Sequence, residues 1–336
     1  MKAFEKILHF CLLLLGSFLV SSRDASAEAF AMLGAPRQGL LTNDKSRNRL
    51  VTTSEPFVSH EQKQTSTRLS LSRGGSSDSK SLGRKKLLRE MLAEFIGTFL
   101  IVQIGTGSVM SAIYTDSLVG LFQIASVWII SVTVAICTTA SISGAHLNPA
   151  VSLAFALIRP SDQFNWKKVI PYSIAQLLGA VAGSCVNLIL YASSIAAYET
   201  SNGIVRATSS GLASARAFGE YFGAPVTASV AFLAETIGTG VLSFVIFALT
   251  NSKNTVMKSG FVPPIIGLTV GSLIAVLAPL TQAGFNPARD FGPRIVAFLA
   301  GWKTVAFQGW WIYVLAPLLG ATVGAYVADK VLYADD

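Results

Sequence analysis

Charged side chains are scarce in this chain of 336 residues, in which Asp, Glu, Lys and Arg together make up 13% of the composition. Histidine and cysteine are scarcer still, with three residues of each. The cysteines lack metal-ligand spacing, so we expect small buried apolar residues rather than ligands or members of a disulfide framework. The sequence has no nucleophile with a nearby base, no phosphate-binding loop and no metal-ligating cluster. We therefore expect neither an enzyme nor a bound cofactor or metal.

The excess positive charge is confined to the amino-terminal part of the chain. Residues 1–90 hold 15 Lys and Arg against 8 Asp and Glu, whereas residues 91–336 hold 11 against 10. The formal net charge of +8 therefore gives no reason to expect a nucleic-acid partner.

Apolar residues are abundant, at 51% of the chain, and the mean hydropathy is +0.55. Several apolar stretches are about 20 residues long, which is enough to cross a lipid bilayer as a helix. These stretches lie near residues 91–113, 118–140, 169–191, 228–250, 261–280 and 311–333. The composition therefore predicts an all-α membrane protein with six transmembrane helices.

Two motifs occur twice in this apolar body. The segment Leu92–Thr98 reappears with few changes as Leu233–Thr239, and the tripeptide Asn-Pro-Ala occurs at residues 148–150 and 286–288. The copies of the first motif are 141 positions apart and those of the second are 138 positions apart. Because these two separations nearly agree, we interpret the body as a duplicated unit, with repeat one near residues 90–193 and repeat two near residues 228–333. Residues 193–227 lie between the repeats and contain no motif that we can interpret.

Each Asn-Pro-Ala opens an apolar run too short to span a membrane, and so predicts a half-helix. Proline fits the first helical position, and the asparagine before it caps the helix. Where two such helices meet at their amino ends, their dipoles repel cations and protons. We expect the amides of Asn148 and Asn286 to be free to donate hydrogen bonds to a passing oxygen. The motif thus indicates a pore for neutral hydroxyl-bearing solutes, formed by Asn148, Pro149, Ala150, Asn286, Pro287 and Ala288.

The first 85 residues are typical of targeting sequence. Residues 1–29 have a basic start, an apolar core and small residues at the end, which predicts a signal peptide. Residues 30–85 are rich in Ser, Thr, Lys and Arg without apolar periodicity, and so we expect them to be disordered. Together they resemble the bipartite presequence of algae with complex plastids; the alternative is a plain secretory signal followed by a flexible tail. Residues 86–336 form the predicted channel domain.

The segments Ser143–Val151 and Gly284–Pro293 resemble the two signature loops of the aquaporin and glycerol facilitator family, the major intrinsic proteins. The resemblance extends over roughly residues 90–333. It implies six tilted transmembrane helices plus two half-helices in an inverted repeat, assembled as a homotetramer. It also implies a passive channel for water and small neutral solutes such as glycerol, which excludes ions and protons.

Arg289 is the most informative single residue, because an arginine inside an otherwise uncharged membrane region is costly and is therefore expected to be functional. The alternative is an arginine held in a structural salt bridge. The resemblance places it in a narrow selectivity filter with Trp128, Ile274 and Ala283. An aromatic wall beside Ile274 and the small Ala283 predicts a wide, apolar filter that suits the carbon backbone of glycerol. The alternative within the family is a water-selective aquaporin.

Further positions relate the chain to different branches of this family. Asp290 and Arg294 resemble glycerol facilitators, and Tyr313 and Val314 are less decisive. Ala283 departs from the glycerol facilitator pattern, which has an aromatic residue there. Taken together, the filter looks closer to that of the nodulin-like plant channels.

Glu94 and Glu235 are carboxylates inside predicted spans. We expect both to accept hydrogen bonds from backbone N–H groups of the adjoining loops, and Gln176 to bond the backbone in the same way. We expect His146 to be a structural imidazole within the first loop, with a pH gate as the alternative. A different class of protein, a proton-coupled secondary transporter, would need Glu94 or Glu235 to titrate.

Overall fold

The computed structural model describes residues 75–118 and 120–334. The predicted signal peptide, residues 1–29, and most of the segment 30–85 lie outside these residues. Within the described residues, the compact unit that holds the channel body begins at Arg84.

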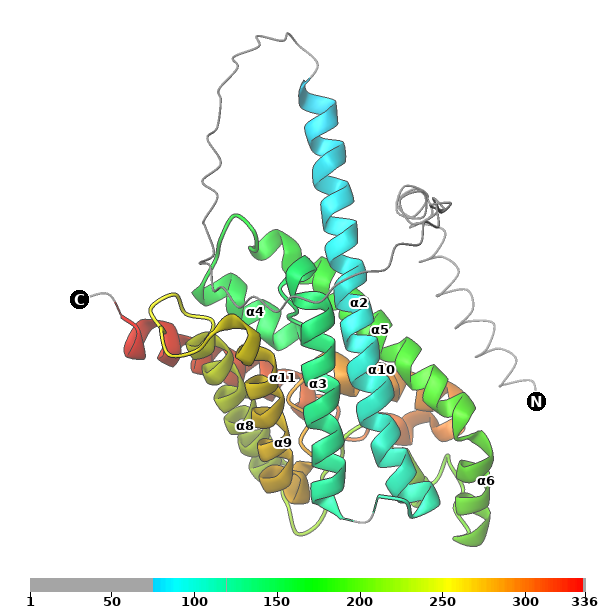
Figure 1. Cartoon of the computed structure of the whole chain (residues 1–336). Coiled ribbons are helices and arrows are strands. Elements are labelled where there is room, and N and C mark those ends of the chain that lie inside the picture. Colours follow the sequence, from blue (N-terminus) through cyan, green and yellow to red (C-terminus); the bar gives the residue numbers. More distant parts are fainter. Residues whose placement is uncertain (1–74, 119, 335–336) are drawn as a thin grey trace, which may run out of the picture. The chain divides into compact units, whose positions relative to one another are not determined.

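Six long helices, each apolar enough to cross a membrane, make up most of this body (Figure 1). Each predicted span overlaps one of them, so the prediction of six spans is confirmed. They are α2 (Gly75–Thr115), α3 (Leu121–Ser143), α5 (Trp166–Leu190), α8 (Ala228–Leu249), α9 (Val262–Thr281) and α11 (Ile312–Tyr326). A π-helix, η5 (Val327–Leu332), continues α11.

The first helix begins earlier than the sequence predicted. Residues 75–85, which we expected to be disordered, belong to α2. The reason is that no proline interrupts the chain between Gly75 and Thr115. Once the apolar span has formed a helix, each preceding residue can add a further backbone hydrogen bond at little cost.

Two short helices, α4 (Pro149–Ile158) and α10 (Pro287–Ala297), begin at the prolines of the Asn-Pro-Ala segments. The asparagine before each proline caps its helix: Asn148 Oδ1 accepts a hydrogen bond from the backbone N–H of Ala150 at 2.9 Å, and Asn286 Oδ1 accepts one from that of Ala288 at 3.0 Å. With 10 and 11 residues, α4 and α10 are too short to cross a membrane. The prediction of two half-helices is therefore confirmed.

The helices of the two repeats cross at matching glycines. A Cβ at Gly179 of α5 would overlap the carbonyl oxygen of Phe95 in α2, and a Cβ at Gly320 of α11 would overlap that of Thr236 in α8. In both pairs the second repeat follows the first by 141 positions, the offset that separates the two copies of the first-span motif. Small residues thus let the backbones approach closely at equivalent points of the two repeats.

Each half-helix packs against a span of the opposite repeat. α4, from repeat one, lies against α11, and α10, from repeat two, lies against α5; α3 and α9 also pack together across the repeats. This exchange interlocks the two halves, so that both half-helices are enclosed by transmembrane helices.

Residues 193–227 are partly helical, as α6 (Ala192–Ser201), the 3₁₀ turn η1 (Ser209–Gly211) and α7 (Leu212–Ala215). The chain then runs without regular structure to Thr227. Its side chains Phe218 and Tyr221 are buried with Trp302, and the Tyr221 hydroxyl donates to the carbonyl of Ala306 at 2.9 Å. Trp302 and Ala306 belong to η3 (Phe298–Trp302) and η4 (Lys303–Phe307), directly after α10. Residues 216–227 are therefore fixed against the second half-helix region.

One expectation about the cysteines is wrong. Cys185 is buried as expected, but Cys137 is exposed on the outward face of α3. Apolar side chains of a membrane helix face lipid as readily as they face the protein core. An apolar run therefore does not show whether a cysteine inside it is buried.

Candidate functional site: a central pore

The two half-helices meet at their amino ends through the asparagines. Asn148 Nδ2 donates a hydrogen bond to the carbonyl of Phe285 at 2.9 Å, and Asn286 Nδ2 donates to the carbonyl of Leu147 at 2.8 Å. A side-chain amide carries two N–H groups. The expectation of free amides is thus wrong for one N–H of each asparagine, because that N–H joins the two loops.

The loops that lead to these asparagines share an unusual backbone. Ala145 and Leu147 have φ of 50° and 51°, and the residues 138 positions later, Ala283 and Phe285, have φ of 66° and 55°. Such left-handed conformations cost an L-residue about 1–2 kcal/mol. Four of them need surrounding contacts that hold the backbone in place.

Two buried carboxylates supply those contacts. Glu94 accepts hydrogen bonds from the backbone N–H groups of His146 and Leu147, at 3.0 and 2.6 Å. Glu235 accepts from those of Gly284 and Phe285, at 3.0 and 2.9 Å. Each carboxylate also accepts from a hydroxyl at the end of the preceding helix, Ser143 Oγ at 2.6 Å and Thr281 Oγ1 at 2.7 Å.

Gln176 and His146 complete the support of the first loop. Gln176 Nε2 donates to Glu94 Oε2 at 2.7 Å and to Ser152 Oγ at 3.1 Å. We expected Gln176 to bond the backbone, but these two partners are side chains. His146 Nδ1 lies 3.2 Å from Ser152 Oγ, and its ring stacks on Phe155 with 4.7 Å between ring centroids.

A cavity of about 450 Å³ lies inside the body, and Asn254, Met257 and Arg289 are among the residues that line it. We call it the large cavity; both asparagines and both approach loops line it. A second cavity of about 210 Å³, the small cavity, lies beyond and is lined by Glu220 and Gln282, among others. Trp128, Ile274 and Arg289 line both cavities. They therefore mark the constriction between them.

The four residues expected to form the filter come together at this constriction. Trp128, Ile274, Ala283 and Arg289 are each at most 4% exposed, and Ala283 lines the large cavity beside the other three. Arg289 Cζ lies 4.4 Å from the centroid of the Trp128 ring. Arg289 Nη1 is buried and has no hydrogen-bond partner within the part of the chain that the structure describes. The constriction thus combines an apolar wall with one unused donor.

The residues expected to distinguish family branches have different positions. Asp290 and Arg294 are buried and joined by a 2.7 Å ion pair from Arg294 Nε to Asp290 Oδ2. Tyr313 is buried beside Gly284, and its hydroxyl donates to the carbonyl of Thr281 at 3.0 Å. Val314 is half-buried and lines neither cavity.

Glu220 is the site residue that the sequence did not reveal. Its carboxylate forms an ion pair with Arg289 Nη2, and both side chains are 4% exposed. Its segment carries no repeated motif and no periodicity, and the scarcity of acidic residues in the body, 10 in residues 91–336, is the signal that could have drawn attention to it.

The family model of the major intrinsic proteins matches residues 81–328. The chain belongs to this family. The resemblance seen in the two signature loops is thereby confirmed, and the six spans with two half-helices are the architecture of a multi-pass membrane channel.

Several members of the family are similar over most of their length. The glycerol uptake facilitator protein of Pseudomonas aeruginosa is 38% identical over 245 residues, which cover 71% of this chain and 87% of that protein. The propanediol uptake facilitator of Citrobacter freundii is 36% identical, over 72% of this chain and 91% of that protein. The X-ray structure of the aquaglyceroporin from Plasmodium falciparum superposes with a TM-score of 0.63 at 28% identity, covering 73% of this chain and 97% of that chain.

Proposed function

We propose that this protein is a passive channel for water and small neutral solutes such as glycerol. The observation that carries the proposal is the constriction, where the Arg289 guanidinium lies over the Trp128 ring beside Ile274 and its Nη1 has no hydrogen-bond partner among the described residues. A polyol has a carbon backbone that fits such a wall and hydroxyls that need a donor.

Two features inside the pore support the exclusion of ions and protons. The amino ends of α4 and α10 meet at the joined asparagines, so that both helix dipoles present their positive ends to the middle of the pore. Arg289 adds a fixed cation at the constriction. A cation in transit would therefore lose its water shell next to these positive charges.

The breadth of the filter favours glycerol over a pore that passes water alone. Ala283 is small and leaves room beside Ile274, whereas a bulkier or polar residue would narrow the constriction. The names of the relatives, which include facilitators of glycerol and propanediol uptake, agree with this proposal.

We propose that Glu94 and Glu235 are structural groups that hold the approach loops, and not proton carriers. Both are 0% exposed, and the hydrogen bonds they accept come from loop backbone groups that have left-handed neighbours. The contacts of His146 and Gln176 support the same structural role for the first loop.

We also propose that residues 1–29 direct the chain into the secretory pathway, that residues 30–85 send it on to a plastid membrane, and that the channel assembles as a homotetramer. The composition of these leader segments and the family resemblance support these proposals. A carboxyl-terminal fluorescent fusion of the full chain, imaged with and without residues 30–74, tests the destination, and native mass spectrometry tests the assembly.

The decisive experiment is stopped-flow light scattering on liposomes that contain the purified full-length protein. We expect flux of both glycerol and water above that of empty vesicles, and an altered ratio of the two fluxes in Arg289→Ala. Arg216→Ala, which removes an exposed arginine, is the matched control and should behave as wild type. Water flux without glycerol flux would favour a water-selective channel, and flux that saturates and collapses with the proton gradient would favour a transporter.

A further inference from the structure

The constriction contains a second charge besides Arg289. Glu220 pairs with the Arg289 guanidinium, and both side chains are almost fully buried. Trp128, Ile274 and Ala283 carry no charge. Within the described residues, the constriction is therefore an ion pair set in an apolar ring.

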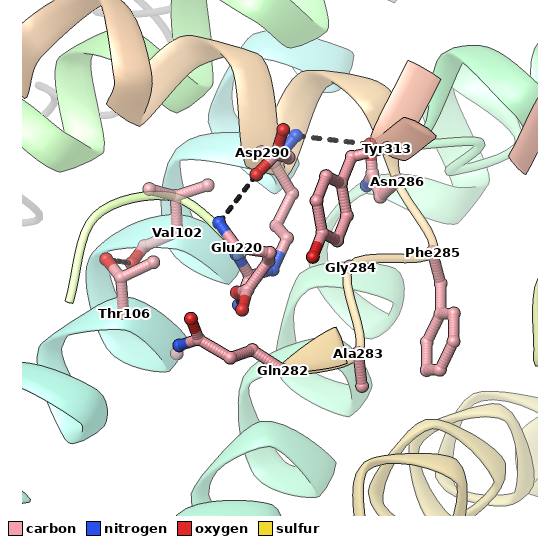
Figure 2. A network of polar contacts seen from close by, with 12 residues as sticks. Val102, Thr106, Glu220, Gln282, Ala283, Gly284, Phe285, Asn286, Asp290 and Tyr313 are labelled. Atoms are coloured by element: carbon pink, nitrogen blue, oxygen red, sulfur yellow. Dashed lines mark hydrogen bonds and ion pairs between the residues drawn. The ribbon is translucent and has the colours of Figure 1, made fainter. Parts of the chain in front are cut away.

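The backbone of Glu220 is held on both sides by α10. Its N–H donates to Asp290 Oδ1 at 2.7 Å (Figure 2). Its carbonyl accepts from Arg294 Nη2. Asp290 and Arg294 are paired with each other and fully buried. Arg294 also donates to the carbonyl of Ala306 at 2.8 Å, so this clamp extends to η4. The neighbour of Glu220 must be small, because a Cβ at Gly219 would lie 2.7 Å from Arg294 Cγ.

Gln282 fixes the same segment from the second approach loop. Its Oε1 accepts from the backbone N–H of Tyr221 at 3.0 Å, and its Nε2 donates to the carbonyl of Arg216 at 3.0 Å. Glu220 and Gln282 both line the small cavity next to Arg289. Because the backbone around Glu220 is fixed in this way, its carboxylate lies beside the path of a solute that crosses the constriction.

We propose that Glu220 is a selectivity-filter residue that determines how strongly Arg289 binds the solute. The inference rests on the proposed channel function. The Glu220 carboxylate holds the guanidinium against Trp128 and offsets its charge. It also gives the small cavity an acceptor beside the donor of Arg289, an arrangement that suits a solute with neighbouring hydroxyls, such as a small polyol.

The expected effect follows from the strength of hydrogen bonds to charged groups. A bond to an unpaired ion is about twice as strong as a bond between neutral groups, and an opposite charge in contact weakens the field that a passing solute experiences. Without the carboxylate, Arg289 would hold each water or hydroxyl longer. Removing the charge of Glu220 should therefore slow permeation and raise its activation energy.

The test compares Glu220→Gln with wild type in liposomes that contain the full-length protein. We expect water and glycerol permeability to fall about threefold to tenfold, with a steeper temperature dependence of flux. Glu199→Gln is the matched control, because Glu199 is also an ion-paired and largely buried carboxylate, here with Arg206, but lines neither cavity. This control should keep wild-type flux and activation energy.

A double-mutant cycle separates a filter role from a purely structural one. If Glu220 acts through Arg289, the Glu220→Gln change should have little further effect when Arg289→Gln is already present. Wild-type flux and activation energy in Glu220→Gln would overturn the inference, as would an equal loss of flux in both backgrounds. If the wild-type protein carries neither water nor glycerol, the proposed function itself fails and the inference fails with it.

Discussion

The two repeats make the same backbone and use it for different purposes. Both have an asparagine-capped half-helix, a left-handed approach loop and a buried carboxylate that binds the loop. The positions in repeat one that match Arg289 and Arg294, 138 residues earlier, hold Val151 and Ala156. The shared features line the large cavity, whereas the two charges at the constriction have no counterpart in repeat one: Arg289 belongs to repeat two, and Glu220 to the segment between the repeats. The features that the two repeats share therefore account for the pore, and the residues in which they differ account for the filter.

The largest effect should come from making repeat two resemble repeat one at the filter. We expect Arg289→Val in a Glu220→Gln background to raise proton and cation leak about tenfold or more, because the fixed cation at the constriction is lost. The second substitution is included because Arg289→Val alone would leave the buried Glu220 carboxylate unpaired at the constriction. A pH-sensitive dye inside the liposomes measures the proton leak.

Glu220→Gln alone is the control for that experiment, since it keeps the arginine. A leak in the double variant no greater than in this control would show that the joined half-helices exclude protons without Arg289. The selective function would then belong to the symmetric part of the pore.

The next effect compares the two loop-binding carboxylates. We expect Glu94→Gln and Glu235→Gln each to lower the free energy of unfolding by about 3 kcal/mol, because hydrogen bonds to a charged group contribute about 1.5–3 kcal/mol and an amide cannot accept all of them. Thermal unfolding in detergent measures the loss, and Asp162→Asn, at an exposed carboxylate, is the control. Tolerance of one substitution and not of the other would contradict an equivalent role in the two repeats.

A smaller effect is expected where the helices cross. Gly179→Ala and Gly320→Ala each place a Cβ against a carbonyl oxygen of the facing helix, and overpacking of this kind costs about 1–3 kcal/mol. The two losses should be similar, because the crossings are equivalent. Gly260→Ala is the control, since no atom lies within 4 Å of a Cβ added there; unequal losses would mean that the two crossings are packed differently.

The smallest effect concerns pH. Burial raises the pKa of the Glu220 carboxyl above its ordinary value of 4.5, while the Arg289 guanidinium opposes the rise. Because the raised pKa lies nearer to neutrality, acidification protonates Glu220 and ends the ion pair. We expect flux to fall about threefold between about pH 8 and about pH 5, the lower end of the fall expected for Glu220→Gln, measured by stopped-flow light scattering.

Glu220→Gln should remove this pH dependence, and an unchanged profile in that variant would assign it to another group. The titratable and charged groups around Glu220 come from α8, α10, α11 and its own segment: Glu235, Arg289, Asp290, Arg294, Tyr313 and Tyr221.

Much of the fold was predictable because membrane spans and half-helices depend on short segments of the sequence. A helix in lipid satisfies its own backbone hydrogen bonds, so a run of about 20 apolar residues is sufficient to predict a span. Asn-Pro-Ala is likewise a local signal, because capping by Asn148 and Asn286 involves residues two positions away. The start of α2 and the exposure of Cys137 were not predictable in this way. One depends on how far a helix propagates, and the other on which face meets lipid.

The amino-acid sequence is sufficient to predict that this protein lies in a lipid bilayer, and to predict its six spans, its two half-helices and an arginine in the pore. Each of these follows from composition, length or a repeated motif. The pairing of Glu220 with Arg289, and the bonds from Asp290 and Arg294 to the Glu220 backbone, could be found only in the folded chain. Glu220 lies in a segment without periodicity, and packing rather than local chain geometry brings it to α10. Ion-pair partners of this kind become visible only when distant segments are seen together.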